Sequence, residues 1–86
     1  MFIKFDITGK GYTELAKAMD EFLGLHFTEA EENGEEVYKG GSITIHKDGR
    51  VTLPKINFAE VIVHELVTTV FVYGIHCEMV CFKEQS

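Results

Sequence analysis

The chain has 86 residues, of which 45% are hydrophobic and 26% are charged, and its formal net charge is −6. This composition is typical of one folded globular domain and excludes an intrinsically disordered chain. Fourteen acidic against eight basic side chains disfavour direct binding to nucleic acid, because proteins neutralise phosphates with Lys and Arg.

The N-terminal segment alternates apolar and polar residues from 2 to 7, which predicts a half-buried strand. A helix is expected next. Thr13 is its predicted N-cap, Glu14 lies in its first turn, and Gly24 follows its last apolar residue, as glycine often does at the end of a helix.

Residues 25–39 are open to two interpretations. Two short strands are one possibility, containing Leu25 and Phe27 in the first and Val37 and Tyr38 in the second. They would be joined around Asn33-Gly34, a pair typical of tight turns. The alternative is an acidic loop over residues 29–36. We favour a ragged hairpin.

Residues 42–53 alternate apolar and polar on both sides of Asp48-Gly49. An Asp-Gly pair between alternating segments is the strongest short-range signal for a β-hairpin. Its apolar residues, which are Ile43, Ile45, Val51 and Leu53, are expected to face the core. The residues expected on the opposite face are Thr44, His46, Arg50 and Thr52.

A second helix is expected to begin near Asn57, after Pro54 ends the preceding strand, and to stop before Gly74. The region from 56 to 75 is long enough to span a bilayer, but Glu60 and Glu65 lie within it, and each acid there costs about 2.5–3.5 kcal/mol. We therefore expect no membrane association.

Residues 75–82 alternate again and predict a last strand. Its two cysteines, Cys77 and Cys81, are expected to point with Met79 towards the helices as small buried hydrophobes. At four residues apart on one strand they are about 13 Å from each other, too far for a disulfide or a shared metal.

These elements define the order β-α-(ββ)-β-β-α-β. The predicted fold is a single α+β domain over residues 1–86, with an antiparallel four- to six-stranded sheet and two helices packed on one face. Without the uncertain hairpin this order resembles the ferredoxin-like βαββαβ arrangement. With it, the first seven elements resemble one half of the TATA-binding-protein fold. Neither resemblance implies a function, since both folds carry many.

The face of the sheet without helices is a candidate contact surface. Uncovered apolar side chains tend to mark sites where proteins associate, so we expect a homo-oligomer. The candidate partner-binding residues on this face are Phe2, His76, Glu78, Val80 and Phe82.

The negative charge is concentrated between residues 14 and 36, where eight acids and one base give a net charge of −7. The simplest interpretation is a solvated face that keeps the protein soluble. The alternative is a docking surface for a protein with a basic surface, through steering and charge complementarity. The candidate residues are Glu29, Glu31, Glu32, Glu35 and Glu36.

Motifs for catalysis or metal binding are weak. His64-Glu65 begins a near match to the H-E-x-x-H zinc motif, but Thr68 replaces the second histidine, and a hydroxyl is a poor zinc ligand. No serine or glycine-rich pattern matches a known catalytic or phosphate-binding motif. We expect no metal, no cofactor and no catalytic residue.

Three classes of function remain. The leading hypothesis is a non-catalytic protein-binding module, an acidic inhibitor or nucleic-acid mimic that acts on a nucleic-acid-handling protein. Small phage- or plasmid-encoded inhibitors, anti-CRISPR proteins among them, are often of this size and charge. The alternative is a small homo-oligomeric enzyme or ligand-binding domain, with a site between subunits built from His46, Arg50, His76 and Glu78. The third is a structural or assembly component. With two cysteines and no signal peptide, a cytoplasmic location is expected.

Overall fold

The computed structural model describes residues 1–9, 11–53 and 60–81. The elements in chain order are β1 (Phe2–Asp6), α1 (Tyr12–Leu23), β2 (Thr28–Glu32), β3 (Glu35–Gly40), β4 (Ile43–His46), β5 (Arg50–Thr52), α2 (Glu60–Val72) and β6 (His76–Cys81). This confirms the predicted α+β class and shows that residues 28–40 form a hairpin. The predictions made for Pro54, Asn57 and Phe82 lie outside the described residues.

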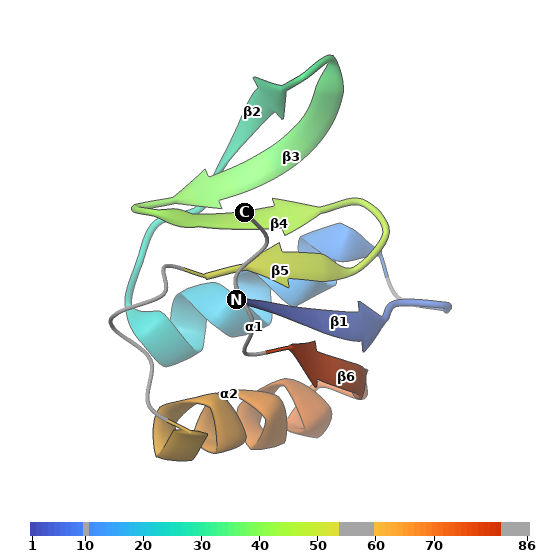
Figure 1. Ribbon diagram of the computed structural model, residues 1–86, viewed down its shortest axis with the longest axis vertical. Helices are drawn as coiled ribbons and strands as arrows, with labels where there is room; N and C mark the ends of the chain where they lie inside the picture. The colour runs from blue at the N-terminus through green and yellow to red at the C-terminus, as the bar shows by residue number, and fades with distance from the viewer. Residues whose placement is uncertain (10, 54–59, 82–86) are drawn as a thin grey trace.

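The strands of the described chain form one six-stranded antiparallel sheet in the order β2-β3-β4-β5-β1-β6 (Figure 1). β1 is antiparallel to both β5 and β6, so these two strands run parallel with β1 between them. β4 is antiparallel to β5 and therefore parallel to β1. Without β2 and β3, this leaves two interleaved β-α-β units, which is the ferredoxin-like arrangement. The β2–β3 hairpin extends that sheet beyond β4.

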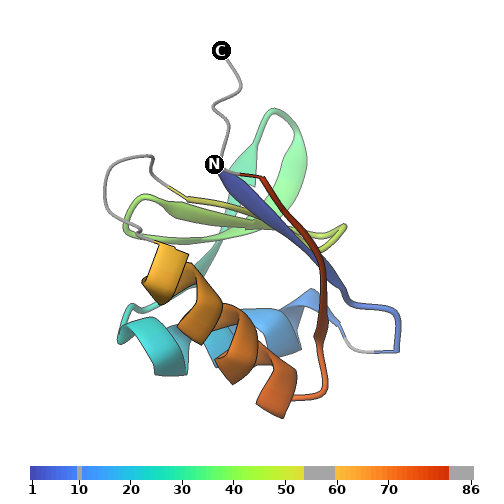
Figure 2. The same ribbon diagram turned by 60° about the horizontal axis from the view of Figure 1, so that its bottom comes forward.

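Both helices cover the same face of the sheet (Figure 2), and the core lies between the two layers. The side chains that are fully buried there include Ile3, Phe5, Leu15, Met19, Ile45, Val51, Leu66, Val70 and Ile75. Burial of each large apolar side chain contributes about 1.5–3 kcal/mol. The predicted inward side of the β4–β5 hairpin is confirmed, because Ile45 pairs directly with Val51 and both are buried.

The start of α1 differs from the prediction. Gly11, in an extended conformation, is the N-cap and makes no side-chain capping hydrogen bond. Thr13 lies inside the helix, and its Oγ1 is 3.2 Å from the hydroxyl of Tyr38. The Thr13 hydroxyl, which the sequence pattern predicted to cap the helix, therefore makes a tertiary contact with Tyr38 instead. The predicted end of the helix is confirmed, since Gly24 has a φ of 67° and its N–H donates to the carbonyl of Asp20.

The last strand contains a β-bulge that overturns part of its predicted orientation. Lys4 pairs with Met79, whereas Phe5 pairs with Cys77, so Glu78 is the extra residue. A bulge shifts the alternation of side chains by one residue.

Three side chains of β6 therefore lie on the face opposite to the predicted one. Val80 pairs with Ile3 and packs against the core, whereas Met79 is 49% exposed and pairs with Lys4 on the open face. Cys81 pairs with Phe2 on that open face. Cys77 packs against the core as predicted, and partial burial raises the pKa of its thiol.

The face without helices is not uniformly exposed. Thr44 and His46 are each only 9% exposed, and Val37, which pairs with His46, is completely buried. The prediction of a bare face is therefore wrong over β3 and β4. Two ion pairs, Lys39–Glu32 and His46–Glu35, join residues that flank Val37 on this face of the sheet.

Candidate protein-binding surface

The β2–β3 hairpin extends away from the two-layered body of the molecule (Figure 1). Its turn consists of Asn33 and Gly34, which have φ values of 54° and 79°. Positive φ at both central residues defines the type I′ turn, whose twist matches that of paired strands. The Asn-Gly pair therefore sets the register that places the acidic side chains.

Four of the five candidate glutamates lie directly opposite one another. Glu31 is opposite Glu36, and Glu32 is opposite Glu35. Like charges in such positions destabilise an antiparallel pair by a few tenths of a kcal/mol to about 1 kcal/mol. The sheet alternation places Glu29, Glu31 and Glu36 on the face turned towards the helices. Glu32 and Glu35 share the other face with Val37.

Three of these carboxylates have a basic neighbour. Glu32 Oε2 is 2.7 Å from Lys39 Nζ, Glu36 Oε2 is 2.6 Å from Lys47 Nζ, and Glu35 Oε1 is 3.4 Å from His46 Nδ1. Hydrogen bonds from the lysines hold the pKa values of Glu32 and Glu36 below their usual range. The last contact lacks hydrogen-bond geometry, because His46 Nδ1 has no hydrogen-bond partner within the described chain.

Glu29 and Glu31 are different, since both are exposed and neither forms an ion pair with any described residue. Of the five predicted acids, these two carry negative charge that the described part of the chain does not neutralise.

A small aromatic cluster lies beside the helix-facing side of the hairpin. The rings of Tyr12, on α1, and Tyr38, on β3, have centroids 4.8 Å apart. Lys47 Nζ lies 5.8 Å from the centroid of Tyr12, within the range of a cation–π interaction. Partial burial raises the pKa of the Tyr12 phenol; the nearby charge of Lys47 opposes this shift, and that of Glu36 adds to it. No local sequence pattern joins Tyr12, Tyr38 and Lys47, so the sequence alone does not indicate this cluster.

This cluster borders a hollow of about 270 Å³ lined by Tyr12, Glu29, Ala30, Glu31 and Glu36. One aromatic ring and three carboxylates thus surround one open depression. Such a lining is complementary to the long side chain of Lys or Arg.

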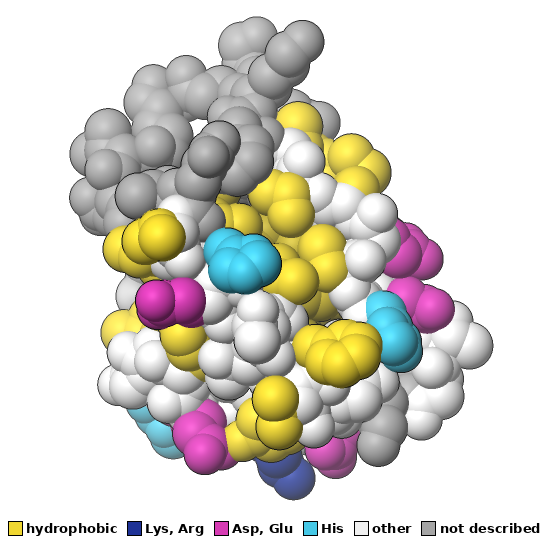
Figure 3. Space-filling view, turned by 90° about the horizontal axis from the view of Figure 1, so that it is seen from below, with side chains coloured by type: hydrophobic (Ala, Val, Ile, Leu, Met, Phe, Trp, Pro, Cys, Tyr) yellow, Lys and Arg dark blue, Asp and Glu magenta, His cyan; other side chains and the backbone are white. Residues whose placement is uncertain are grey.

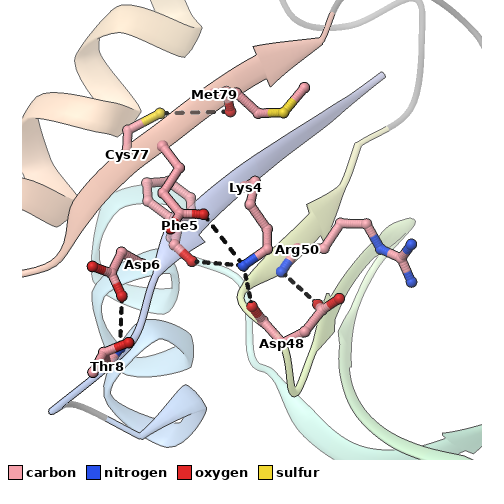
Figure 4. Close-up of polar contacts among 9 residues, drawn as sticks. Lys4, Phe5, Asp6, Thr8, Asp48, Arg50, Cys77 and Met79 are labelled. Carbon is pink, nitrogen blue, oxygen red and sulfur yellow. Dashed lines mark hydrogen bonds and ion pairs between the residues drawn. The ribbon is translucent and has the colours of Figure 1, made fainter.

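The other candidate residues lie far from the hairpin. β6 is one edge of the sheet and β2 is the other, so the predicted partner-binding residues that the structure describes do not form one surface. Glu78, at the bulge, has its Oε2 3.5 Å from Lys4 Nζ. Lys4 Nζ also donates to the carbonyl of Asp48 at 2.5 Å (Figure 4). Glu78 therefore belongs to a local network that ties β6 to the β4–β5 turn.

The remaining predicted residues at this edge have separate environments. His76 is exposed and its ring makes an edge contact with Phe71, with centroids 5.0 Å apart. Phe2 is half-buried, and Val80 is turned towards the core.

Among the residues that the structure describes, the large apolar side chains with the greatest exposure lie on α2. Val61, Phe71 and Val72 are 66%, 55% and 79% exposed. Figure 3, which views the molecule from the side of α2, shows apolar patches next to histidine and acidic side chains. On the same helix, Val63, Leu66 and Val70 are buried against the core.

The residues of the alternative ligand site do not converge within one subunit. His46 and His76 lie on strands separated by β5 and β1, a distance of about 14 Å at ~4.8 Å per strand. His46 is buried, and its Nε2 is 3.3 Å from the hydroxyl of Thr52. Arg50 donates its backbone N–H to Asp48 Oδ1 at 2.9 Å.

Metal-ligating side chains are also dispersed. In the part of the chain that the structure describes, no three His, Cys, Asp or Glu side chains are close enough to hold a metal ion. His64 and Glu65 are exposed on α2, and Thr68 Oγ1 donates to the carbonyl of His64 at 2.9 Å. Within the described ranges, neither helix has the length and apolar character needed to cross a membrane.

Comparison with known proteins found no family model, no curated protein and no solved structure that matches this chain. The likeness to the TATA-binding-protein fold therefore stays a prediction.

Proposed function

We propose that this protein is a non-catalytic protein-binding module whose acidic hairpin, β2–β3, binds a basic surface of a partner. The observation that carries the proposal is the direct opposition of Glu31 with Glu36 and of Glu32 with Glu35. These pairs weaken the hairpin in the free protein. A partner that supplies Lys and Arg side chains converts this repulsion into attraction, and long-range steering also accelerates association.

The partner class that this surface suits best is a nucleic-acid-handling protein. Its phosphate-binding groove presents clustered Lys and Arg side chains. A projecting strip of carboxylates on both faces of a hairpin would compete with nucleic acid for that groove. The proposed role is therefore that of a small acidic inhibitor, of the kind found among phage anti-defence and anti-CRISPR proteins, acting inside the cell.

The test is a pull-down from native lysate with tagged protein, at 50 mM and 500 mM salt, with the captured proteins identified by mass spectrometry. Because exposed charges are screened at high salt, we expect the captured protein to elute at 500 mM. Added double-stranded DNA should also release it. The hairpin variant replaces by Gln the five acids Glu29, Glu31, Glu32, Glu35 and Glu36.

A matched control separates the hairpin from net charge. It neutralises five acids elsewhere by the substitutions Glu14→Gln, Asp20→Asn, Glu21→Gln, Glu60→Gln and Glu65→Gln. The hairpin variant should lose the partner, whereas the control should keep it. Equal capture by both variants, or equal loss in both, would overturn the proposal.

Self-association is a second candidate, and the exposed apolar residues of α2 favour it. Val61 and Val72 are both more than 60% exposed, and surfaces of this kind often mediate contacts between subunits. Static light scattering should then give a dimer or larger mass, and Val61→Glu with Val72→Glu should reduce it to the monomer. A monomer mass for the unmodified chain at about 100 μM would reject this candidate.

A further inference from the structure

The outer side of β2 is an open edge of the sheet. β2 pairs with β3 on one side, and no described strand pairs with it on the other. Edge strands with free backbone groups are templates for a further strand, and proteins protect them with charged side chains among other devices. On β2, the charged side chains at this edge are those of Glu29 and Glu31, and both are exposed.

The turn determines which backbone groups of β2 point outward. In a two-residue hairpin loop the flanking residues, Glu32 and Glu35, exchange backbone hydrogen bonds. Along an antiparallel pair such hydrogen-bonded positions alternate with non-hydrogen-bonded ones. Ala30 is therefore bonded to β3 through its backbone, whereas Glu29 and Glu31 direct their N–H and C=O groups to the open side.

The same two residues line the hollow beside Tyr12. Their side chains lie on the helix-facing side of the sheet, two residues apart. A strand added at this edge would place alternate side chains directly across from Glu29 and Glu31, with Cβ atoms about 4.5–5.5 Å apart. The chain already places one cation in a comparable environment, because Lys47 Nζ contacts both Glu36 and the ring of Tyr12.

We propose that the edge of β2 binds an extended basic segment of a partner protein, which adds to the sheet as a strand. Two of its Lys or Arg side chains, spaced two residues apart, lie against Glu29 and Glu31 and enter the hollow beside Tyr12. Backbone hydrogen bonds to Glu29 and Glu31 hold the segment, and its charge selects it. This inference rests on the proposed function and names the chemistry and mode of binding of the partner.

Charge identifies the occupant of this edge. A second copy of the chain paired through β2 would bring glutamates of both copies together, which is unfavourable. Nucleic acid is repelled for the same reason. A basic strand satisfies both the open backbone groups and the two carboxylates that lack a described partner.

The test uses two synthetic peptides of equal composition, measured by calorimetry and by NMR of the ¹⁵N-labelled protein. One has three Lys residues at alternate positions between Val and Thr, and the other has the three Lys residues together. The alternating peptide should bind about tenfold more tightly, and it should slow the exchange of the Glu29 and Glu31 amide protons. Equal affinity and unprotected amides would overturn strand addition.

A pair of variants separates the backbone from the charge. Glu31→Gln and Glu31→Pro remove the same carboxylate, but only the proline removes the outward N–H. Proline is tolerated at such edge positions, and circular dichroism checks that both variants are folded. Glu31→Pro should bind the alternating peptide at least about fivefold more weakly than Glu31→Gln, and equal affinities would contradict the proposal.

The outcomes also distinguish this inference from the proposed function. If both peptides bind equally and salt abolishes their binding, the acidic hairpin is a charge surface and only strand addition fails. If neither peptide binds, and the hairpin variant still captures the same protein from lysate, both proposals fail.

Discussion

The two hairpins of this sheet turn at similar dipeptides, Asn33-Gly34 and Asp48-Gly49, but they are held in different ways. A Cβ atom added at Gly34 would meet no other atom within 4 Å. At Gly49, where φ is 94°, it would overlap the carbonyl oxygen of Phe5. The carbonyl of Gly49 also accepts a hydrogen bond of 2.9 Å from the N–H of Phe5.

The β4–β5 turn is thus fixed to the core strand β1, whereas the β2–β3 turn depends on its own geometry. This difference explains where the acidic charge is tolerated. A hairpin that contributes little to the core can carry opposed glutamates at a local cost, and the rest of the fold is unaffected. A turn that touches β1 has no such freedom.

The largest expected difference in the free energy of unfolding is between substitutions of the two turn glycines. Gly49→Ala should lower the free energy of unfolding by about 3 kcal/mol or more, because it combines a left-handed φ with a steric overlap against β1. Gly34→Ala should cost about 1 kcal/mol, because only the positive φ is unfavourable. Urea unfolding followed by circular dichroism measures both values. Equal losses would show that the two turns are held alike.

A smaller difference in stability is expected between substitutions of two valines that are both completely buried. Val51 lies in the main core, and Val51→Ala should cost about 2–3 kcal/mol, because the close-packed surroundings leave a cavity. Val37 lies outside that core, among long charged side chains that can collapse onto the space. Val37→Ala should therefore cost about 1 kcal/mol. Urea unfolding followed by circular dichroism measures both values. A larger loss of unfolding free energy for Val37→Ala than for Val51→Ala would contradict this distinction.

A still smaller effect concerns the opposed glutamates. Glu31→Gln removes a repulsion and no described ion pair, so it should raise the free energy of unfolding by up to about 0.5 kcal/mol. Glu21→Gln, an exposed change on α1, is the control and should have no measurable effect. If Glu31→Gln destabilised the protein, the opposed carboxylates would not be a source of strain.

The last prediction concerns pH and the two lysines of the hairpin region. Because Lys39 and Lys47 lower the folded-state pKa values of Glu32 and Glu36, their contribution to stability is present above the usual glutamate pKa, near 4.5. It is lost as the pH falls through the lowered values. In Lys47→Gln, NMR titration should show the midpoint of Glu36 returning towards its usual value. The midpoint of Glu32, which Lys39 determines, should stay unchanged, and parallel shifts of both would refute this assignment.

Much of the fold follows from local patterns. The alternation on both sides of Asp48-Gly49, the helical spacing before Gly24 and the Asn-Gly turn correctly predicted a hairpin, a helix end and a second hairpin. The predicted acidic residues do lie together, because one turn holds them in one register. The predicted residues on β6 were less accurate, since Val80 turned out to face the core.

What the amino-acid sequence determined by itself is therefore the set of elements, their turns and the location of the negative charge, because each depends on residues close together in the chain. Tertiary structure alone decided the bulge at Glu78, the burial of Val37 and His46, and the position of Tyr12 beside the hairpin. The bulge depends on how β6 aligns with β1, more than seventy residues earlier, and a local pattern of side chains contains no information about that alignment.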